Sequence, residues 1–209
     1  MTDEGRDVVG PLVLRAWDDF LSLVEPLDLD APSRLPGWRV HEVCVHLGAW
    51  PEHDALAGVL ASAREGQLDR LPDSDEINAV LVAAHRDASR DEVLDALVRA
   101  RDNAEDYFTS PDDSLDGVLT GSVVGPLPVL SVLLGGTYEL AVHALDLAPA
   151  GAPAPSDRLL LTGLGALAEV TGALAARTGL NESASLHAPT GGWTFAARDG
   201  GWTTRRLGP

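Results

Sequence analysis

The spacing of hydrophobic residues predicts a mainly helical chain. In the first half of the sequence, apolar positions recur every three or four residues, which is the period of a helix with one buried face. Ser89 and Glu92 have the spacing of a capping box at a helix start, and so do Asp73 and Glu76. Pro51 is expected to kink or divide the second helix. The helices expected in this half cover residues 11–25 and 40–60, a third that starts near residue 73 or 74 and carries apolar residues up to 84, and a fourth that starts at residues 89–92 and reaches 107 or 108.

The second half begins with the most apolar stretch of the chain. Residues 117–138 contain no Asp, Glu, Lys or Arg. Glycines and prolines interrupt the stretch, so a loop leading into a buried helix is expected rather than a membrane span. That helix should cover residues 128–147, with Gly135 and Gly136 allowing either close approach of another helix or a kink.

Beyond this helix the hydrophobic period changes. One more helix is expected over residues 156–177. After it, Trp193, Phe195 and Ala197 alternate with less apolar residues, which is the period of a strand. The turn signal at 199–201 then predicts a β-hairpin, and residues 183–188 predict a third strand.

These elements predict a mainly α fold in two parts. Residues 1–150 should form a four- or five-helix bundle, and residues 151–209 a small C-terminal α/β appendage of one helix and short antiparallel strands. The segment APAGAPAP at 148–155 has the composition of a linker between them. A length of 209 residues allows one domain of ordinary size with such an appendage.

Charge and composition narrow the class of protein. A formal net charge of -17 argues against binding to nucleic acid or to an anionic membrane surface. All basic residues are arginine, which excludes a lysine Schiff base and suggests actinobacterial, G+C-rich coding. Cys44 is the single cysteine and the N-terminus lacks the layout of a signal peptide. We therefore expect a cytoplasmic protein without an intrachain disulfide.

The first chemical signal is a carboxylate and an imidazole four residues apart. Glu139 and His143 lie in GTYELAVHALDL, directly after the uncharged stretch, and would share one face of a helix. A carboxylate in apolar surroundings is costly to desolvate unless something compensates it. A divalent metal ion is the compensation that suits a Glu and His pair best.

His46 is the best candidate for a third ligand. It lies in LPGWRVHEVCVHLGAW and shares a helix face with core-like residues, including Val43 and Leu47. One histidine from this helix, together with Glu139 and His143, makes a His₂Glu set of the kind found in catalytic zinc sites with an open position. The same donors suit nickel, iron and manganese, and helix bundles commonly build such sites between facing helices.

Two carboxylates could orient the imidazole ligands. Asp146 follows His143 by three residues and could accept a hydrogen bond from its second ring nitrogen, or could lie in solvent near the end of the helix. Glu42 precedes His46 by four residues and could play the same part. The alternative for Glu42 is an exposed carboxylate in the first turn, where the helix dipole favours it.

Two further residues are candidates for the wall of a substrate pocket. Trp50 follows His46 by four residues, and its alternative is ordinary core packing. His53 follows His46 by seven residues and could line the same cavity, although Pro51 leaves its direction open.

The two segments that carry these residues resemble a known family. LPGWRVHEVCVHL matches the pattern P-G-W-x-V-x-[DE]-V-x-x-H-L, and YELAVHALDL matches E-x-x-x-H-x-x-D-L. Both patterns are those of the mycothiol-dependent maleylpyruvate isomerase family, within the DinB-like superfamily of metal-dependent four-helix bundles. The resemblance implies a divalent metal, usually zinc, at the positions of His46, Glu139 and His143. It also implies mycothiol as a small thiol partner and a small α/β domain after the bundle.

The function implied is that of an enzyme that activates mycothiol as a thiolate. The thiolate would serve S-transfer to a small electrophilic substrate, or its cis–trans isomerisation. Active isomerases of the family use arginines near the pocket, for which the candidates here are Arg86, Arg198, Arg205 and Arg206. A non-catalytic metal-binding or small-molecule-binding module and a metal-assisted hydrolase are the alternatives. The sequence is compatible with a monomer and with a homodimer.

Overall fold

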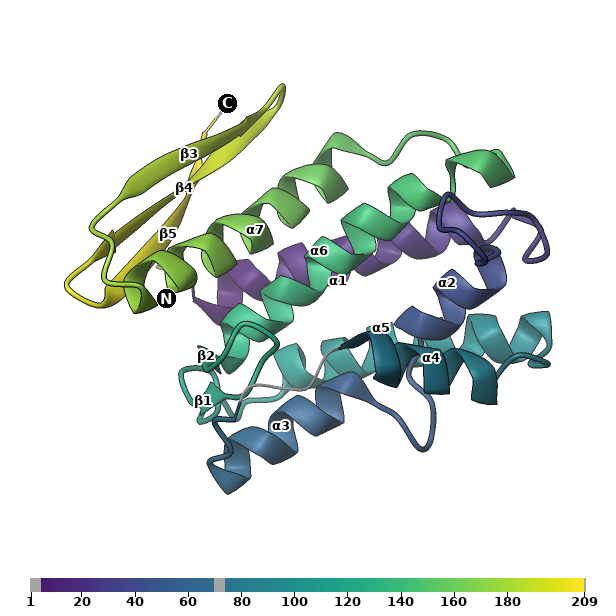
Figure 1. The fold of residues 1–209 in the computed structure, drawn as a ribbon, viewed down its shortest axis with the longest axis horizontal. Helices are drawn as coiled ribbons and strands as arrows, with labels where there is room; N and C mark the ends of the chain where they lie inside the picture. The colour runs from purple at the N-terminus through teal and green to yellow at the C-terminus, as the bar shows by residue number, and fades with distance from the viewer. Residues whose placement is uncertain (1–4, 70–73, 209) are drawn as a thin grey trace.

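The computed structural model describes residues 5–69 and 74–208, and these residues form a helical bundle with a small sheet at the C-terminal end (Figure 1). The helices are α1 (Arg6–Val24), α2 (Val40–Leu47), α3 (Ala55–Glu65), α4 (Ser74–Ala84), α5 (Arg90–Thr109), α6 (Val129–Asp146) and α7 (Asp157–Arg177), with a 3₁₀ turn at Ala148–Ala150. The mainly helical fold and its C-terminal sheet agree with the prediction at this coarse level. Asp73, which was predicted to form a capping pair with Glu76, lies outside the described residues.

Five short strands complete the described part of the chain. The strands β1 (Leu119–Thr120) and β2 (Leu127–Pro128) pair before α6, and β3 (Ser183–Ala188), β4 (Gly191–Arg198) and β5 (Gly201–Leu207) form an antiparallel sheet in that order. Asp199 and Gly200, between β4 and β5, both have positive φ (52° and 79°), as a tight two-residue hairpin turn requires. The hairpin and the strand over 183–188 were predicted.

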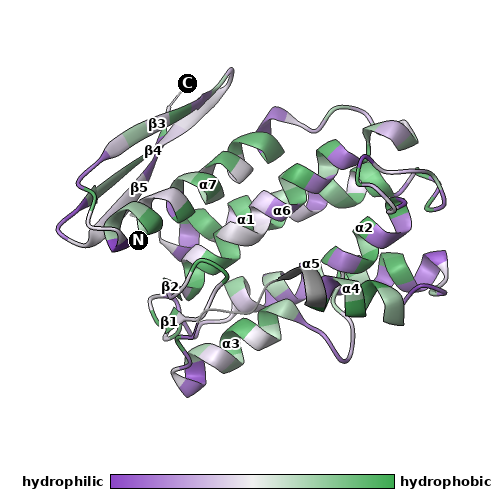
Figure 2. Cartoon of the chain, in the orientation of Figure 1, coloured by the Kyte–Doolittle hydropathy of each residue, from purple (hydrophilic) through white to green (hydrophobic). Residues whose placement is uncertain are grey.

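Helix α6 packs against both α1 and α7, which also contact each other, and α5 packs against α1 and α2. Hydrophobic residues recur along every helix of the bundle (Figure 2). Aliphatic side chains fill most of the core; Val43, Leu97 and Leu134 are fully buried, and Phe20 adds an aromatic ring. This matches the low aromatic content of the sequence.

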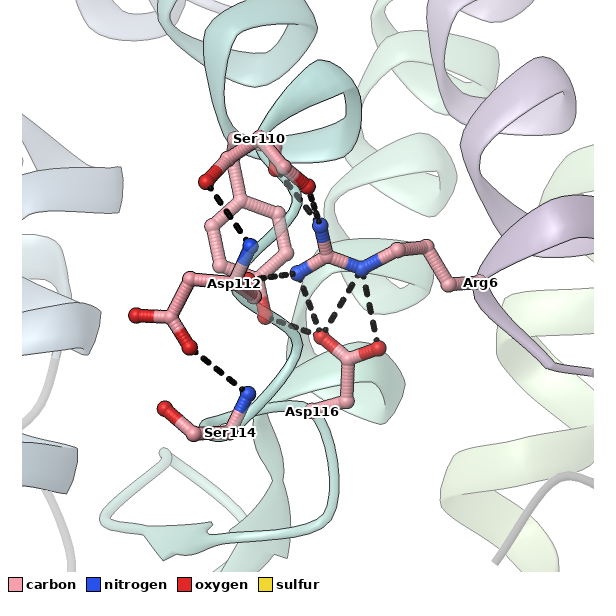
Figure 3. Close-up of polar contacts among 6 residues, drawn as sticks. Arg6, Ser110, Asp112, Ser114 and Asp116 are labelled. Carbon is pink, nitrogen blue, oxygen red and sulfur yellow. Dashed lines mark hydrogen bonds and ion pairs between the residues drawn. The ribbon is translucent and has the colours of Figure 1, made fainter.

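Helix α1 begins at Arg6, five residues before the predicted start, because Arg6 is anchored (Figure 3). Its guanidinium donates three hydrogen bonds to Asp116, two from Nε at 2.9 and 3.2 Å and one from Nη2 at 2.7 Å. It also donates to three backbone carbonyl oxygens at and after the end of α5, those of Tyr107, Ser110 and Asp112. This anchoring holds the first turn of α1 against α5. The same contacts offset the stability that α1 loses because Pro11 has no backbone N–H to donate inside the helix.

The helix predicted over residues 40–60 is divided, and the break lies at Gly48 rather than at Pro51. Helix α2 ends at Leu47, and α3 starts after Asp54, whose side chain caps it by accepting from the Ala57 amide. A Cβ at Gly48 would lie 2.8 Å from the Cβ of Ala96, so α2 ends in close contact with α5.

The close helix contact expected at Gly135 and Gly136 occurs elsewhere. A Cβ added at either glycine would meet no atom outside its own helix segment within 4 Å among the described residues. The tight approach is at Gly163 of α7, where a Cβ would lie 2.6 Å from that of Ala141 on α6. The small residue that lets α6 and α7 pack closely is therefore on α7.

Helix α7 connects the sheet to the bundle. Trp193 of β4 is 1% exposed, lies against Gly165, and donates to the Leu161 carbonyl oxygen at 2.8 Å. Glu169 is fully buried, and its carboxylate accepts from three donors: Ser131 of α6, and Trp202 and Thr204 of β5. Because α7 also packs on α1 and α6, it contacts both parts of the fold. The division at residues 150 and 151 stays a prediction.

One described helix, α7, is long and apolar enough to cross a membrane by length and composition alone. In the fold, 67% of its most apolar window is buried, as is usual for a core helix. The uncharged stretch 117–138 forms β1, β2 and the first half of α6.

Candidate metal centre

The structure brings His46, Glu139 and His143 together where α2 meets α6. One donor atom from each residue lies within 4.8 Å of the other two. Oε2 of Glu139 is 3.6 Å from Nε2 of His46 and 3.5 Å from Nε2 of His143. The imidazole rings meet edge to face, with centroids 5.1 Å apart. Two segments nearly a hundred residues apart in the sequence thus converge on one point.

Apolar packing sets this convergence. Val43 and Cys44 of α2 lie in one buried cluster with Leu140 and Ala144 of α6. On α2, His46 comes three residues after Val43 and two after Cys44. On α6, Glu139 and His143 each come directly before a buried residue, Leu140 and Ala144. The ligand face therefore lies at the edge of the core, and the side-chain exposure follows: 15% for His46, 11% for His143 and 50% for Glu139.

Asp146 lies behind His143, at the position predicted for an orienting carboxylate. Its Oδ2 is 3.0 Å from Nδ1 of His143, and both side chains are buried. An acceptor there places the ring proton on Nδ1, and the lone pair of Nε2 faces Glu139. The backbone carbonyl oxygen of Asp146 accepts from the Arg34 amide at 2.8 Å, which fixes this end of α6.

The donor set fits a single divalent ion. Nitrogen to oxygen distances of 3.5 and 3.6 Å are long for hydrogen bonds, which centre on about 2.9 Å. Two ligand atoms about 2.1 Å from one tetrahedral zinc ion are about 3.4 Å apart, which is close to these separations. Nδ1 of His46 is buried and has no hydrogen-bond partner among the described residues. The polar atoms are therefore arranged around a common centre rather than bonded to one another.

The charges within the site favour an ionised carboxylate. The nearby ring nitrogens of His143 and His46 stabilise the carboxylate and lower the pKa of Glu139 to about 2. Burial lowers the pKa of His143, but the carboxylates of Glu139 and Asp146 outweigh it and raise that pKa above its usual value. A metal ion must therefore compete with a proton at His143, while Glu139 is available as an anion throughout the neutral range.

Glu42 has a different partner from the one predicted. Its carboxylate binds Arg39, at 2.7 Å from Nη2 to Oε1 and 2.7 Å from the Arg39 amide to Oε2. Burial raises the pKa of Glu42, but these bonds outweigh it and lower that pKa to about 2. Glu42 thus closes the N-terminal capping box of α2, because at the third helical position its side chain reaches the free amide before it reaches the next turn.

Trp50 and His53 pair with each other instead of extending the face of His46. Their backbones exchange two hydrogen bonds of 2.9 Å, and the Trp50 indole donates to the Val45 carbonyl oxygen. The Trp50 ring stacks on His85 at 3.6 Å and lines a cavity of about 490 Å³, and none of the three candidate ligands lines that cavity. The predicted i to i+4 relation to His46 is lost because α2 ends at Leu47.

The aromatic neighbour of the triad is Trp38, which the sequence reasoning missed. Its ring centroid lies 5.8 Å from that of His46, and the side chain is half-buried. Its place in the same P-G-W segment as the first ligand was the available signal. The four candidate arginines, Arg86, Arg198, Arg205 and Arg206, are all exposed.

Comparison with known proteins places this geometry in a family. Residues 12–148 match the family described as "Mycothiol maleylpyruvate isomerase N-terminal domain". Crystal structures of the mycothiol-dependent maleylpyruvate isomerase and of a mutant of it each superpose with a TM-score of 0.61 at 17% identity, covering 89% of this chain and 78% of the other. At that identity the superposition shows a shared fold alone. No curated protein sequence matches this chain.

Proposed function

Because the chain belongs to the mycothiol maleylpyruvate isomerase family, we propose that it is an enzyme that uses mycothiol on a small electrophilic substrate. We propose further that the enzyme is metal-dependent, with His46, Glu139 and His143 holding one divalent ion. The observation that carries this proposal is the convergence of their donor atoms, at separations that suit two ligands of one ion. Zinc suits a His₂Glu set best, and nickel, iron and manganese suit the same donors.

The metal, when bound, supplies the Lewis acidity that turns a thiol into a thiolate. A free thiol with a pKa near 8.5 is only about 3% thiolate at pH 7. Residues of the chain would hold the metal ion and leave one side of it open to the thiol. His46 and His143 hold the buried side of the site, and the half-exposed Glu139 leaves the other side accessible to a small molecule. Asp146 keeps the proton of His143 on Nδ1, and Trp38 provides an aromatic ring beside His46.

Attack of the thiolate at this site leads to one of two reactions, cis–trans isomerisation or S-transfer. Addition of a thiolate to a conjugated alkene leaves a single bond about which the substrate rotates, and expulsion of the thiol then completes a cis–trans isomerisation. Release of the adduct instead gives S-transfer. Cys44 is buried and free, and burial raises the pKa of its thiol to about 12, so we assign the nucleophile to the small thiol and not to Cys44. We place the enzyme in the cytoplasm, where such thiols are kept reduced.

Metal content and thiol-dependent turnover test this proposal together. The purified chain is expected to hold about one equivalent of metal and to consume monochlorobimane only when mycothiol is present. His46→Ala and His143→Ala should each lower turnover by roughly a hundredfold or more and lose the metal. His187→Ala is the matched control, because His187 is exposed on β3.

Other outcomes would favour the alternatives. Less than about 0.2 equivalents of metal after supplementation removes the metal-dependent enzyme. Stoichiometric metal without turnover would leave a non-catalytic module. Cleavage of an ester or amide without thiol would identify a metal-assisted hydrolase, in which water takes the accessible side of the triad.

A further inference from the structure

Two adjacent glycines in the middle of α6, Gly135 and Gly136, are not explained by the packing of the fold. Glycine is one of the least favourable residues in the interior of a helix, so its presence usually has a local reason. A close contact with another element is one such reason, but a Cβ at either position would meet no atom within 4 Å among the described residues. A left-handed backbone is another, but neither glycine has a positive φ and α6 runs through both without a break. We call these two residues the glycine pair.

The glycine pair lies on the face of α6 that carries the candidate metal ligands. Gly136 precedes Glu139 by three residues and Gly135 precedes it by four, so both lie one turn before that ligand on the same side of the helix. Side chains in a helix lean toward its N-terminus, so the side chain of Glu139 leans over this turn. The space that the glycine pair leaves unfilled is therefore next to the half-exposed carboxylate of the triad.

This face of α6 is buried at both ends and exposed between them. Val129 and Ser131 at the start of the helix are fully buried, and His143 and Asp146 near its end are buried as well. Val132 and the glycine pair, which lie between these ends, are partly or largely exposed. The uncovered part of the face is thus confined to the turns beside the triad, on the side that stays accessible to a small molecule.

The side chains that α6 presents to this space carry no charge. Residues 117–138 contain no Asp, Glu, Lys or Arg, so no charged residue of α6 precedes Glu139. Among the described residues, the ion pairs of Glu139 are with two imidazoles and not with an arginine. Arg39, at the start of α2, is held by the carboxylate of Glu42. A carboxylate on a substrate would therefore lose water beside the glycine pair without gaining a guanidinium, whereas an uncharged substrate needs no such partner.

We propose that the electrophile of the proposed enzyme binds over the glycine pair and is an uncharged molecule. This inference rests on the proposed function and adds to it the class of substrate and the residues that select it. Because neither glycine has a side chain, the substrate can approach the backbone of α6 next to the accessible side of the triad. A larger side chain at position 136 would occupy the same space and point back toward Val132.

Substitution of Gly136 tests the position of the substrate, with consumption of dimethyl maleate in the presence of mycothiol as the assay. The thiolate adds to one alkene carbon, and either rotation and expulsion of the same thiolate or protonation of the other carbon completes the reaction without a further reactant. Gly136→Ala and Gly136→Leu should lower kcat/KM in that order, the second by roughly tenfold or more, with metal content unchanged. Gly58→Leu is the matched control, because Gly58 lies on the exposed side of α3 and a Cβ there also meets no described atom within 4 Å. Its kcat/KM should stay within about twofold of the unmodified chain.

Metal content and stability identify the cause of a lost activity. Gly136→Ala should be at least as stable as the unmodified chain, since alanine favours a helix, so a lower kcat/KM in this variant would not come from unfolding. An unchanged kcat/KM in Gly136→Leu overturns the proposal. Loss of metal together with turnover also overturns it, because the glycine pair would then serve the placement of Glu139 and not of the substrate.

Maleate and dimethyl maleate test the charge of the substrate, because they share one alkene and differ by two negative charges at neutral pH. Each kcat/KM is divided by the rate constant of the uncatalysed reaction with mycothiol, which removes the difference in intrinsic reactivity. The diester should then exceed maleate by roughly a hundredfold or more, and an equal or larger value for maleate overturns the proposal.

The same measurements separate this inference from the proposed function. A chain that binds metal and consumes monochlorobimane with mycothiol, but prefers maleate or tolerates Gly136→Leu, refutes the inference alone. A chain without metal or without thiol-dependent turnover refutes the proposed function, and the inference with it.

Discussion

Replacing Asp146 by Asn isolates the contribution of one carboxylate to metal affinity. Oδ2 of Asp146 is 3.0 Å from Nδ1 of His143, and the two side chains are 9% and 11% exposed, so this is a charge-assisted hydrogen bond in a buried place. Asn has almost the same shape and keeps the packing. It removes the negative charge and can turn its amide hydrogens toward Nδ1, which would move the ring proton to the nitrogen that should bind metal. Loss of such a partner costs about 10- to 100-fold in affinity, or about 1.4 to 2.7 kcal/mol.

The assay is competition for zinc against a chromophoric chelator at fixed pH, with the dissociation constant as readout. Asp146→Asn is expected to raise that constant within the range above. The control is Glu42→Gln, which changes a carboxylate at a similar distance along its own helix that binds Arg39 instead of a ligand imidazole. Its effect should stay below about threefold. Equal effects of the two variants, or an unchanged constant in Asp146→Asn, would refute the assignment of Asp146 to His143. Circular dichroism should show that both variants keep the helical content of the unmodified chain.

Two further predictions concern stability. Glu42→Gln should lower the free energy of unfolding by about 1 to 2 kcal/mol at pH 7, a figure reduced because Arg39 is 41% exposed. Since the folded-state pKa of Glu42 is lowered from 4.5 to about 2, this contribution is fully present above pH 4.5 and is lost as the pH falls toward 2, so urea unfolding at pH 7 and pH 3 should show the difference shrinking. Gly165→Ala should destabilise by about 1 to 3 kcal/mol, because its Cβ would lie 2.6 Å from Cε2 of Trp193. Gly135→Ala, with nothing in the way, should stabilise by about 0.5 to 1 kcal/mol; thermal unfolding shifts of the same sign would contradict this pair.

The sequence predicted the helices where local signals are strong. Ser89 closes a capping box at the start of α5, and Ser156 caps α7. Both features depend on residues within one helical turn, so they can be read from the sequence. The start of α1 depends instead on Arg6 contacting the end of α5, about a hundred residues away. The end of α2 depends on the approach of Gly48 to Ala96. Contacts across such distances leave no local pattern.

The candidate site was likewise predictable only where it depends on spacing within one helix. The spacing of Glu139 and His143 places them on one face of any helix, and Asp146 follows by the same rule. Trp50 and His53 were assigned on the assumption that the helix continued past His46. Once α2 ends at Leu47, spacing beyond that residue says nothing about direction. Trp38 lies before the start of α2, where helical spacing does not predict the direction of a side chain. Only the fold could therefore place its ring beside that of His46.

The carboxylate of Glu169 limits how this chain can change over evolutionary time. It is fully buried, and the Trp202 indole and the Thr204 hydroxyl, which both donate to it, belong to the last strand. A lineage that lost or exchanged this strand would keep an acidic group in the interior without those donors, at a cost of several kcal/mol. We therefore expect the terminal sheet and the acidic residue at position 169 to change together, so that a descendant with a different sheet carries a neutral residue there.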